Sequence, residues 1–142
     1  MVLLERDGVA EVVIVVAAVI ERAGLILAAR RTGPPALAGR WEFPGGKREP
    51  GESDHEALER ECVEEMGVRI AVGSRIGPEY AIANGAMVVR TYLAELVSGE
   101  PAPIESHDAV CWVRPGSEEA RELHWLDGDL AILDALEERA AA

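Results

Sequence analysis

The 142-residue sequence is poor in basic residues: 14 Lys and Arg stand against 26 Asp and Glu, which gives a formal net charge of −12 at pH 7. A surface with this charge repels the phosphate backbone of nucleic acids and the headgroups of anionic membranes. We therefore expect neither a nucleic acid polymer nor a membrane as a partner. The acidity can serve solubility alone, or part of it can serve to hold a cation.

Cysteine is also scarce, and its placement excludes common metal sites. Cys62 and Cys111 form no CxxC or Cys/His spacing, and each lies in apolar sequence, so we expect two buried free thiols. The three histidines, His55, His107 and His124, lack ligand spacing and are predicted to lie at the surface. The sequence shows no Ser/His/Asp or Cys/His set of the kind that would indicate catalysis by a nucleophilic side chain.

Long hydrophobic runs are missing as well. The longest, Val12–Ile20, is too short to cross a bilayer. The residues before it include Glu5, Arg6, Asp7 and Glu11 instead of a positive patch, and no cleavage-like site follows, so a signal peptide is not indicated. We predict a buried strand here and a cytoplasmic protein.

At 49% hydrophobic residues, the chain can bury roughly two-thirds of its unfolded surface in a single domain, which we expect to span residues 1–142. The patterns predict strands over residues 12–20, 25–29, 41–43, 70–82, 87–97 and 109–113. A final helix is expected to be capped by Asp127 or Asp129 and to dock through Leu130, Leu133 and Leu136. The fold class is therefore α/β, with a mixed sheet flanked by helices.

A further helix is predicted between Ser53 and Met66. Ser53 and Glu56 form a capping box at its start, and Gly67 provides a left-handed stop. Three residues share an apolar arc about 80° wide that would face the core: Leu58, Cys62 and Met66.

Three carboxylates lie on the neighbouring arc of this helix. Glu61, Glu64 and Glu65 fall within about 100° of one another, and two such charges about 6 Å apart repel by roughly 2–3 kcal/mol. Arg60 offsets Glu64 at the i+4 position, but nothing on this arc offsets the other two. A solvated acidic face is one interpretation. A site for Mg²⁺ or Mn²⁺, which prefer oxygen ligands, is the other.

The segment before the helix is expected to be a tight loop. Gly45 and Gly46 would let the backbone turn and expose a carbonyl oxygen as a further ligand. Glu52, at the end of the loop, is placed to pair with Arg60 and so to fix the loop on the helix.

Residues 46–68 resemble a complete Nudix box. Gly46 is followed after five residues by Glu52 and after seven more by the run RECVEEMGV, residues 60–68. Seven fixed positions at roughly 7% usage each make a chance match on the order of one in a million. Cys62 stands where the family usually has a larger aliphatic residue.

The resemblance extends to the MutT-like branch of the Nudix family, which hydrolyses nucleoside triphosphates. The run GRWEFPGGK at residues 39–47, the Arg30-Arg31 pair, Trp112-Val113 and Trp125-Leu126-x-x-Asp129 follow that branch. The resemblance implies the Nudix fold, an α/β/α sandwich with a mixed β-sheet and a catalytic loop-helix-loop. It also implies that water attacks a phosphorus of the triphosphate and releases a monophosphate and pyrophosphate.

The resemblance also assigns roles to the box. Glu61, Glu64 and Glu65 would hold Mg²⁺, with Mn²⁺ as a possible substitute, and the Gly45 carbonyl would complete the set of ligands. Arg60 and Glu52 would orient the helix and the loop. In this reading Glu61 and Glu64, with Arg60, Glu52 and Glu105, form the catalytic set.

The assignment of Glu105 depends on how the loop before Trp112 is counted, because family members often carry an acidic residue there. Counting forward from Gly99 selects Glu105, whereas counting back from Trp112 selects Ser106. Glu105 is therefore either a metal ligand or base, or an ordinary surface acid.

Three residues are expected to bind the substrate. Asp129 occupies a position from which this branch often contacts the base, although an N-cap role fits equally well. Arg30 or Arg31 could contact phosphate or base.

Several functions remain open. We favour hydrolysis of 8-oxo-dGTP, with hydrolysis of (d)CTP or 5-methyl-dCTP as the alternative. A Nudix-fold binding module without catalysis is disfavoured because every charged position of the box is intact. Nucleotide sugars and dinucleotides are disfavoured by the short chain. The sequence predicts no oligomeric state.

Overall fold

The computed structural model describes residues 3–6 and 9–142, and side-chain surroundings from residue 12 onward. Asp7, in the acidic stretch before Val12, lies outside the described residues. The elements, in chain order, are β1 (Leu3–Arg6), β2 (Val9–Arg22), β3 (Leu25–Arg31), β4 (Trp41–Glu42), β5 (Gly45–Lys47), α1 (Asp54–Met66), β6 (Arg69–Arg75), β7 (Tyr80–Ile82), the 3-10 turn η1 (Ala83–Gly85), β8 (Met87–Ser98), β9 (His107–Val113), α2 (Glu118–Glu122) and α3 (Asp127–Ala141).

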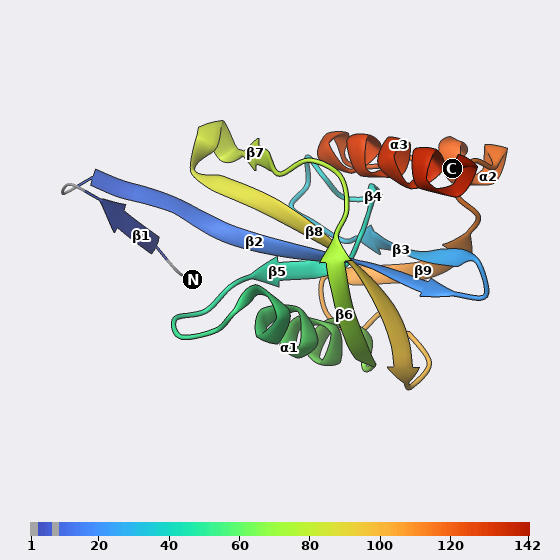
Figure 1. The fold of residues 1–142 in the computed structure, drawn as a ribbon, viewed down its shortest axis with the longest axis horizontal. Helices are drawn as coiled ribbons and strands as arrows, with labels where there is room; N and C mark the ends of the chain where they lie inside the picture. The colour runs from blue at the N-terminus through green and yellow to red at the C-terminus, as the bar shows by residue number, and fades with distance from the viewer. Residues whose placement is uncertain (1–2, 7–8) are drawn as a thin grey trace.

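The strands form one mixed sheet with helices on both sides. Its central path runs β4-β3-β2-β8-β6, and β1, β5, β7 and β9 pair with its members at the margins. β2 and β8 are parallel, whereas the other pairs are antiparallel. Helix α1 covers one face of the sheet, and α2 and α3 lie on the other (Figure 1). This arrangement is the predicted α/β/α sandwich.

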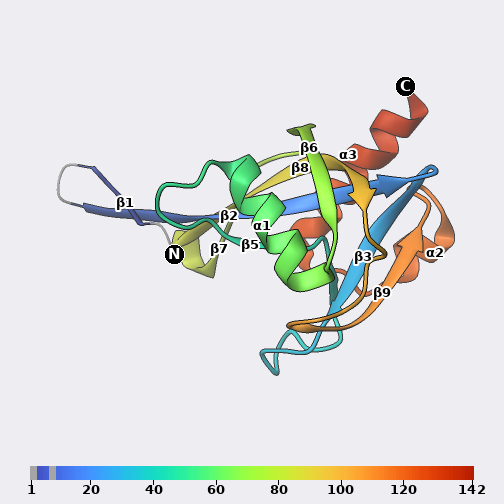
Figure 2. The ribbon, with the colours of Figure 1, turned by 90° about the horizontal axis from the view of Figure 1, so that it is seen from below.

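Strand β2 is buried on both faces, as its continuous apolar run predicts. Alternate residues point to opposite sides of a strand. Ile14, Val16 and Ile20 belong to the core beneath α1, whereas Ala17 and Val19 belong to the core beneath α3. The strand therefore holds the two layers together, and the view from below shows α1 lying across it (Figure 2).

Helix α1 begins and ends as the sequence predicts. The Ser53 side chain accepts a hydrogen bond from the Glu56 amide, the Glu56 carboxylate accepts one from the Ser53 amide, and Gly67 adopts φ 70°. The predicted apolar arc is buried, with Leu58, Cys62 and Met66 fully enclosed. Both cysteines are free; Cys62 is buried as expected, whereas Cys111 is only half-buried.

The strand expected over residues 70–82 is two strands, β6 and β7, separated by residues 76–79. Gly45 and Gly46, expected in a loop, lie in strand β5 and pair with Ala17 and Val16 of β2. The short helix α2 has only five residues, too few to give a periodic pattern. Each difference arises where a segment is too short for hydrophobic spacing to define it.

The final helix also departs from expectation. Its N-cap residue is Leu126, which provides no side-chain cap, so neither Asp127 nor Asp129 caps the helix. Leu133 is buried with Leu136, but Leu130 faces outward at 39% exposure. No helix among the described residues is long and apolar enough to cross a membrane.

Candidate active site

A cavity of about 610 Å³ lies where β3 diverges from β2. β3 pairs with β2 only at Glu21 and Arg22, whereas β5 pairs with β2 at residues 15–17. The ends of several elements therefore meet around one hollow. Polar residues from five elements and from the loop before β9 line it: Arg31, Glu42, Glu65, Tyr80, Asp129 and Ser106.

Strand β5 forms one wall of the cavity because its glycines let it approach both neighbours. A Cβ on Gly45 would lie 1.9 Å from the Val16 carbonyl oxygen, and a Cβ on Gly46 would lie 2.4 Å from the Glu61 carboxyl carbon. Neither glycine has a positive φ. Close approach is therefore the reason for glycine at both positions, in place of the tight turn that the sequence suggested.

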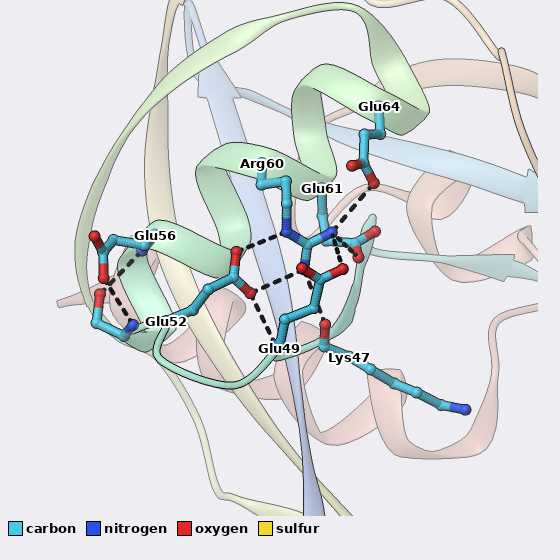
Figure 3. Close-up of polar contacts among 8 residues, drawn as sticks. Lys47, Glu49, Glu52, Glu56, Arg60, Glu61 and Glu64 are labelled. Carbon is cyan, nitrogen blue, oxygen red and sulfur yellow. Dashed lines mark hydrogen bonds and ion pairs between the residues drawn. The ribbon is translucent and has the colours of Figure 1, made fainter. Parts of the chain in front are cut away.

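Arg60 is the charged centre of the box (Figure 3). Its Nε and Nη2 donate to the Glu52 carboxylate at 2.6 and 3.0 Å, and Nη2 also donates to the Lys47 carbonyl at 3.1 Å. The hydrogen bond from Arg60 lowers the pKa of Glu52. This geometry brings Arg60 and Glu52 together as predicted, and it fixes the loop on α1.

The same guanidinium contacts two of the three arc carboxylates. Arg60 Nη1 donates to Glu61 at 2.9 Å and to Glu64 at 3.1 Å. Glu61 lies against Gly46 with 13% of its side chain exposed, whereas the Glu64 side chain is 50% exposed on the outer surface of the helix. Glu64 therefore does not line the cavity.

Glu65 is turned into the cavity with its charge poorly compensated. Burial first, and then the negative charges of Glu61 and Glu42, raise the pKa of Glu65 to about 8. Its Oε2 is buried without a hydrogen-bond partner among the described residues.

The described residues contain no set of three His, Cys, Asp or Glu side chains converging as a metal site. Glu61 and Glu65 nevertheless fit a divalent cation, because they are hard oxygen donors whose mutual repulsion such an ion would relieve. Gly45 lines the same cavity as Glu65.

A cluster around Glu42 was not predicted from the sequence. Arg31 Nη1 donates to Glu42 Oε1 at 2.9 Å, and His107 Nε2 lies 2.8 Å from Glu42 Oε2. His107 is 6% exposed, so its predicted surface position is wrong. Strand β9 starts at His107 and pairs with the end of β3 at Arg31, which brings residues distant in sequence to one wall.

Asp129 also lines the cavity and is almost fully buried. Tyr80 Oη donates to Asp129 Oδ1 at 3.1 Å, with the Tyr80 ring packed over Gly128. Burial and the charge of Glu42 raise the pKa of Asp129 to about 7, although hydrogen bonds from Tyr80 and the Phe43 backbone act in the opposite direction.

Arg30 and Glu105, like Glu64, do not line the cavity. Arg30 is directed to the surface, where Nε donates to Asp108 Oδ1 at 2.7 Å. Glu105 is exposed and does not line the cavity, whereas the neighbouring Ser106 does. Ser106 has φ 60°, and its carbonyl accepts a hydrogen bond from the Thr32 amide.

The parent protein should lose stability as the pH rises from 5 to 8, and replacing Asp129 with asparagine should abolish that loss. Asp129 has a pKa of about 7 in the folded chain and 3.8 as its ordinary value, so the folded state retains its proton between those values. Stability from this group is present at low pH and is lost as the pH rises toward 7. Relative to the variant, the parent should lose roughly 2–3 kcal/mol between pH 5 and pH 8.

Urea unfolding of the parent and Asp129→Asn at both pH values measures this effect. An equal difference in unfolding free energy between the two proteins at pH 5 and pH 8 would show that Asp129 titrates normally.

The sequence matches the model of the NUDIX domain family over residues 11–133. A Mycobacterium tuberculosis protein named as an 8-oxo-dGTP diphosphatase is 44% identical over 119 residues, which is 82% of each chain. The Escherichia coli protein named CTP pyrophosphohydrolase is 37% identical over 127 residues, covering 85% of this chain and 88% of the relative.

The fold is likewise similar to solved structures. A MutT NUDIX hydrolase from Burkholderia pseudomallei superposes with a TM-score of 0.76 at 29% identity, covering 89% of this chain and 98% of the other. The family match covers the box, the cavity wall at Glu42 and Asp129 of α3. The chain therefore belongs to the Nudix family, as a MutT-like hydrolase of phosphoric anhydride bonds.

Proposed function

We propose that this protein is a Mg²⁺-dependent nucleoside triphosphate pyrophosphohydrolase, with 8-oxo-dGTP as its substrate. The observation that carries the proposal is that Glu65 and Gly45, from the box, line the same cavity as Glu42 and Asp129, from outside it. We assign Glu65 and Gly45 to the phosphate side of a bound nucleotide and Glu42 and Asp129 to its base side, so that one molecule contacts both pairs.

At the phosphate side, Glu61 and Glu65 would hold the metal ion, with the Gly45 carbonyl as a further ligand. Glu64 lies outside the cavity but shares Arg60 with Glu61, and it would be the third carboxylate ligand. When bound, the ion would neutralise phosphate charge and lower the pKa of a water molecule. Mn²⁺ is a possible substitute, since it also prefers oxygen ligands. Arg60 joins helix α1 to the Lys47 carbonyl of β5 and to Glu52, so Arg60 and Glu52 would position these carboxylates without contacting the substrate.

The reaction needs no covalent enzyme intermediate. A water oxygen forms a bond to a phosphorus atom, one P–O anhydride bond breaks, and the products are a nucleoside monophosphate and pyrophosphate. The water proton passes to a nearby base, for which the Glu61 and Glu65 carboxylates beside the cavity are the candidates. Precise placement of the phosphate chain supplies the rest of the rate increase.

At the base side, Asp129 and Glu42 both offer carboxyl groups to the cavity. Guanine-type bases present several N–H donors, so two carboxyl acceptors suit 8-oxoguanine. A protonated Asp129 can also donate, and would then fit cytosine, which has one amino donor beside a ring acceptor. The alternative substrate is therefore (d)CTP or 5-methyl-dCTP. The names of the two relatives show the same division, since one is named for 8-oxo-dGTP and the other for CTP.

A panel of nucleoside triphosphates in Mg²⁺ tests the substrate. The proposal expects kcat/KM for 8-oxo-dGTP to exceed that for dGTP, dCTP, CTP and 5-methyl-dCTP by at least about tenfold, which corresponds to about 1.4 kcal/mol of additional transition-state binding. A preference of similar size for CTP or 5-methyl-dCTP would replace 8-oxo-dGTP with the alternative. Pyrophosphate release from none of them would favour the binding module.

The remaining expectations concern the setting of the enzyme. Residues 1–142 as one domain and a cytoplasmic location are consistent with a small nucleotide as the substrate, and both stay predictions.

A further inference from the structure

His107 is a buried polar residue that the proposed reaction does not use. Its side chain is 1% exposed, at the start of β9 and behind the wall of the cavity. Buried polar side chains are retained at a cost unless they are hydrogen-bonded. His107 therefore needs a structural or a functional reason to lie there.

The first contact of His107 fixes Glu42. Nε2 lies 2.8 Å from Glu42 Oε2, and the other oxygen, Oε1, accepts from Arg31 Nη1 at 2.9 Å. A carboxylate can only accept, so Nε2 carries the hydrogen of this bond. Glu42 is thus held from both sides, with 14% of its side chain exposed at the cavity.

The second nitrogen of His107 faces Glu65 without bonding to it. Nδ1 lies 3.8 Å from Glu65 Oε2, which is too long for a hydrogen bond, and neither atom has a partner among the described residues. The ring therefore stands between the carboxylates of Glu42 and Glu65 but bonds only to Glu42.

We propose that His107 is a positioning residue that holds the Glu42 carboxylate toward the nucleotide, and so sets the affinity of the cavity for the base. The inference rests on the proposed function, since it assigns Glu42 to the base side of that same cavity. His107 touches no reacting atom. Without its Nε2–H, Glu42 is held only by Arg31 and can turn toward that guanidinium, away from the ligand.

Two substitutions separate the roles of the two nitrogens. His107→Gln places an amide nitrogen near the position of Nε2 and can still donate to Glu42, whereas His107→Asn reaches only the position of Nδ1. His124→Gln, at an exposed histidine, is the matched control. Melting temperatures of all variants verify that each one folds.

We expect His107→Asn to raise KM about tenfold with kcat within about twofold of the parent, because a hydrogen bond to a charged group is lost at the binding site. His107→Gln and His124→Gln should stay within about twofold of the parent in both constants. Calorimetric titration with 8-oxo-dGMP, the monophosphate product of the proposed reaction, in EDTA should show the same pattern: a raised Kd for His107→Asn and a Kd near that of the parent for the other two variants.

The proposal is overturned if His107→Gln is as impaired as His107→Asn, if His107→Asn binds the nucleotide like the parent, or if kcat falls while KM stays unchanged. The last outcome would mean that the ring acts through Glu65. A parent protein that hydrolyses no triphosphate contradicts the proposed function instead. The monophosphate titration still tests His107 in that case, and a parent without measurable nucleotide binding contradicts both.

Discussion

Replacing Glu61 with glutamine is expected to lower kcat about a thousandfold and to leave the protein folded. Glu61 lies against Gly46 beside the cavity and adjoins the buried Glu65, so it is the arc carboxylate best placed to share an ion with it. A bound metal ion contributes several kcal/mol to catalysis, and each 1.36 kcal/mol is a factor of ten in rate. Glutamine retains the shape of the side chain but removes the charge that holds the ion.

Glu59→Gln is the matched control, because Glu59 lies on the same helix and is exposed. Rates of pyrophosphate release from both variants, together with thermal melting, separate catalysis from folding. The assignment of Glu61 fails if the two variants retain similar activity. It fails equally if Glu61→Gln loses activity only because it no longer melts cooperatively.

The second large effect is expected at Gly45, where alanine should unfold the protein or destabilise it by more than about 3 kcal/mol. The added Cβ would lie 1.9 Å from the Val16 carbonyl oxygen and 2.8 Å from the Ala17 Cα, both backbone atoms of β2. Backbone atoms in a buried strand cannot move aside, so β5 itself must separate from β2. Overpacking usually costs about 1–3 kcal/mol, and this contact is closer than real Cβ atoms tolerate.

Gly46→Ala should behave differently although it is the neighbouring residue. The three atoms nearest to its Cβ would all belong to the carboxylate of Glu61, at 2.4–2.7 Å, and a side-chain end can rotate away. We expect stability within about 1 kcal/mol of the parent but a loss of activity on the order of 100-fold, because a displacement of about 1 Å at a reacting centre can cost that much.

Urea unfolding and activity measurements on both variants test this contrast, with Gly33→Ala as the control, since nothing would lie within 4 Å of its added methyl group. Equal stability of the Gly45→Ala and Gly46→Ala proteins would contradict the packing of β5 described above. Full activity of Gly46→Ala would contradict the placement of Glu61.

The sequence predicts the catalytic helix well because its signals are local. A capping box, an apolar arc and a left-handed glycine act within a few residues, and the pairing of Arg60 with Glu52 spans only eight. Strand β2 was equally clear, since a continuous β-branched run is typical of a strand covered on both faces.

The base side of the cavity was harder to predict because its residues meet only through tertiary structure. Glu42 and His107 are 65 positions apart, and Tyr80 and Asp129 are 49 apart. Nothing near His107 in the sequence indicates burial, since Ser106 and Asp108 on either side are polar. The GRWEFPGGK run did place Glu42 near the box, but its partners could not be inferred without the register of β9 on β3.

The most direct test of the central claim is a product analysis of triphosphate hydrolysis by the parent protein, in Mg²⁺ and in EDTA. We predict that monophosphate and pyrophosphate appear in equal amounts in Mg²⁺ and that neither forms in EDTA. Release of inorganic phosphate and a diphosphate instead, or an unchanged rate in EDTA, would contradict a metal-dependent pyrophosphohydrolase site built on Glu61 and Glu65.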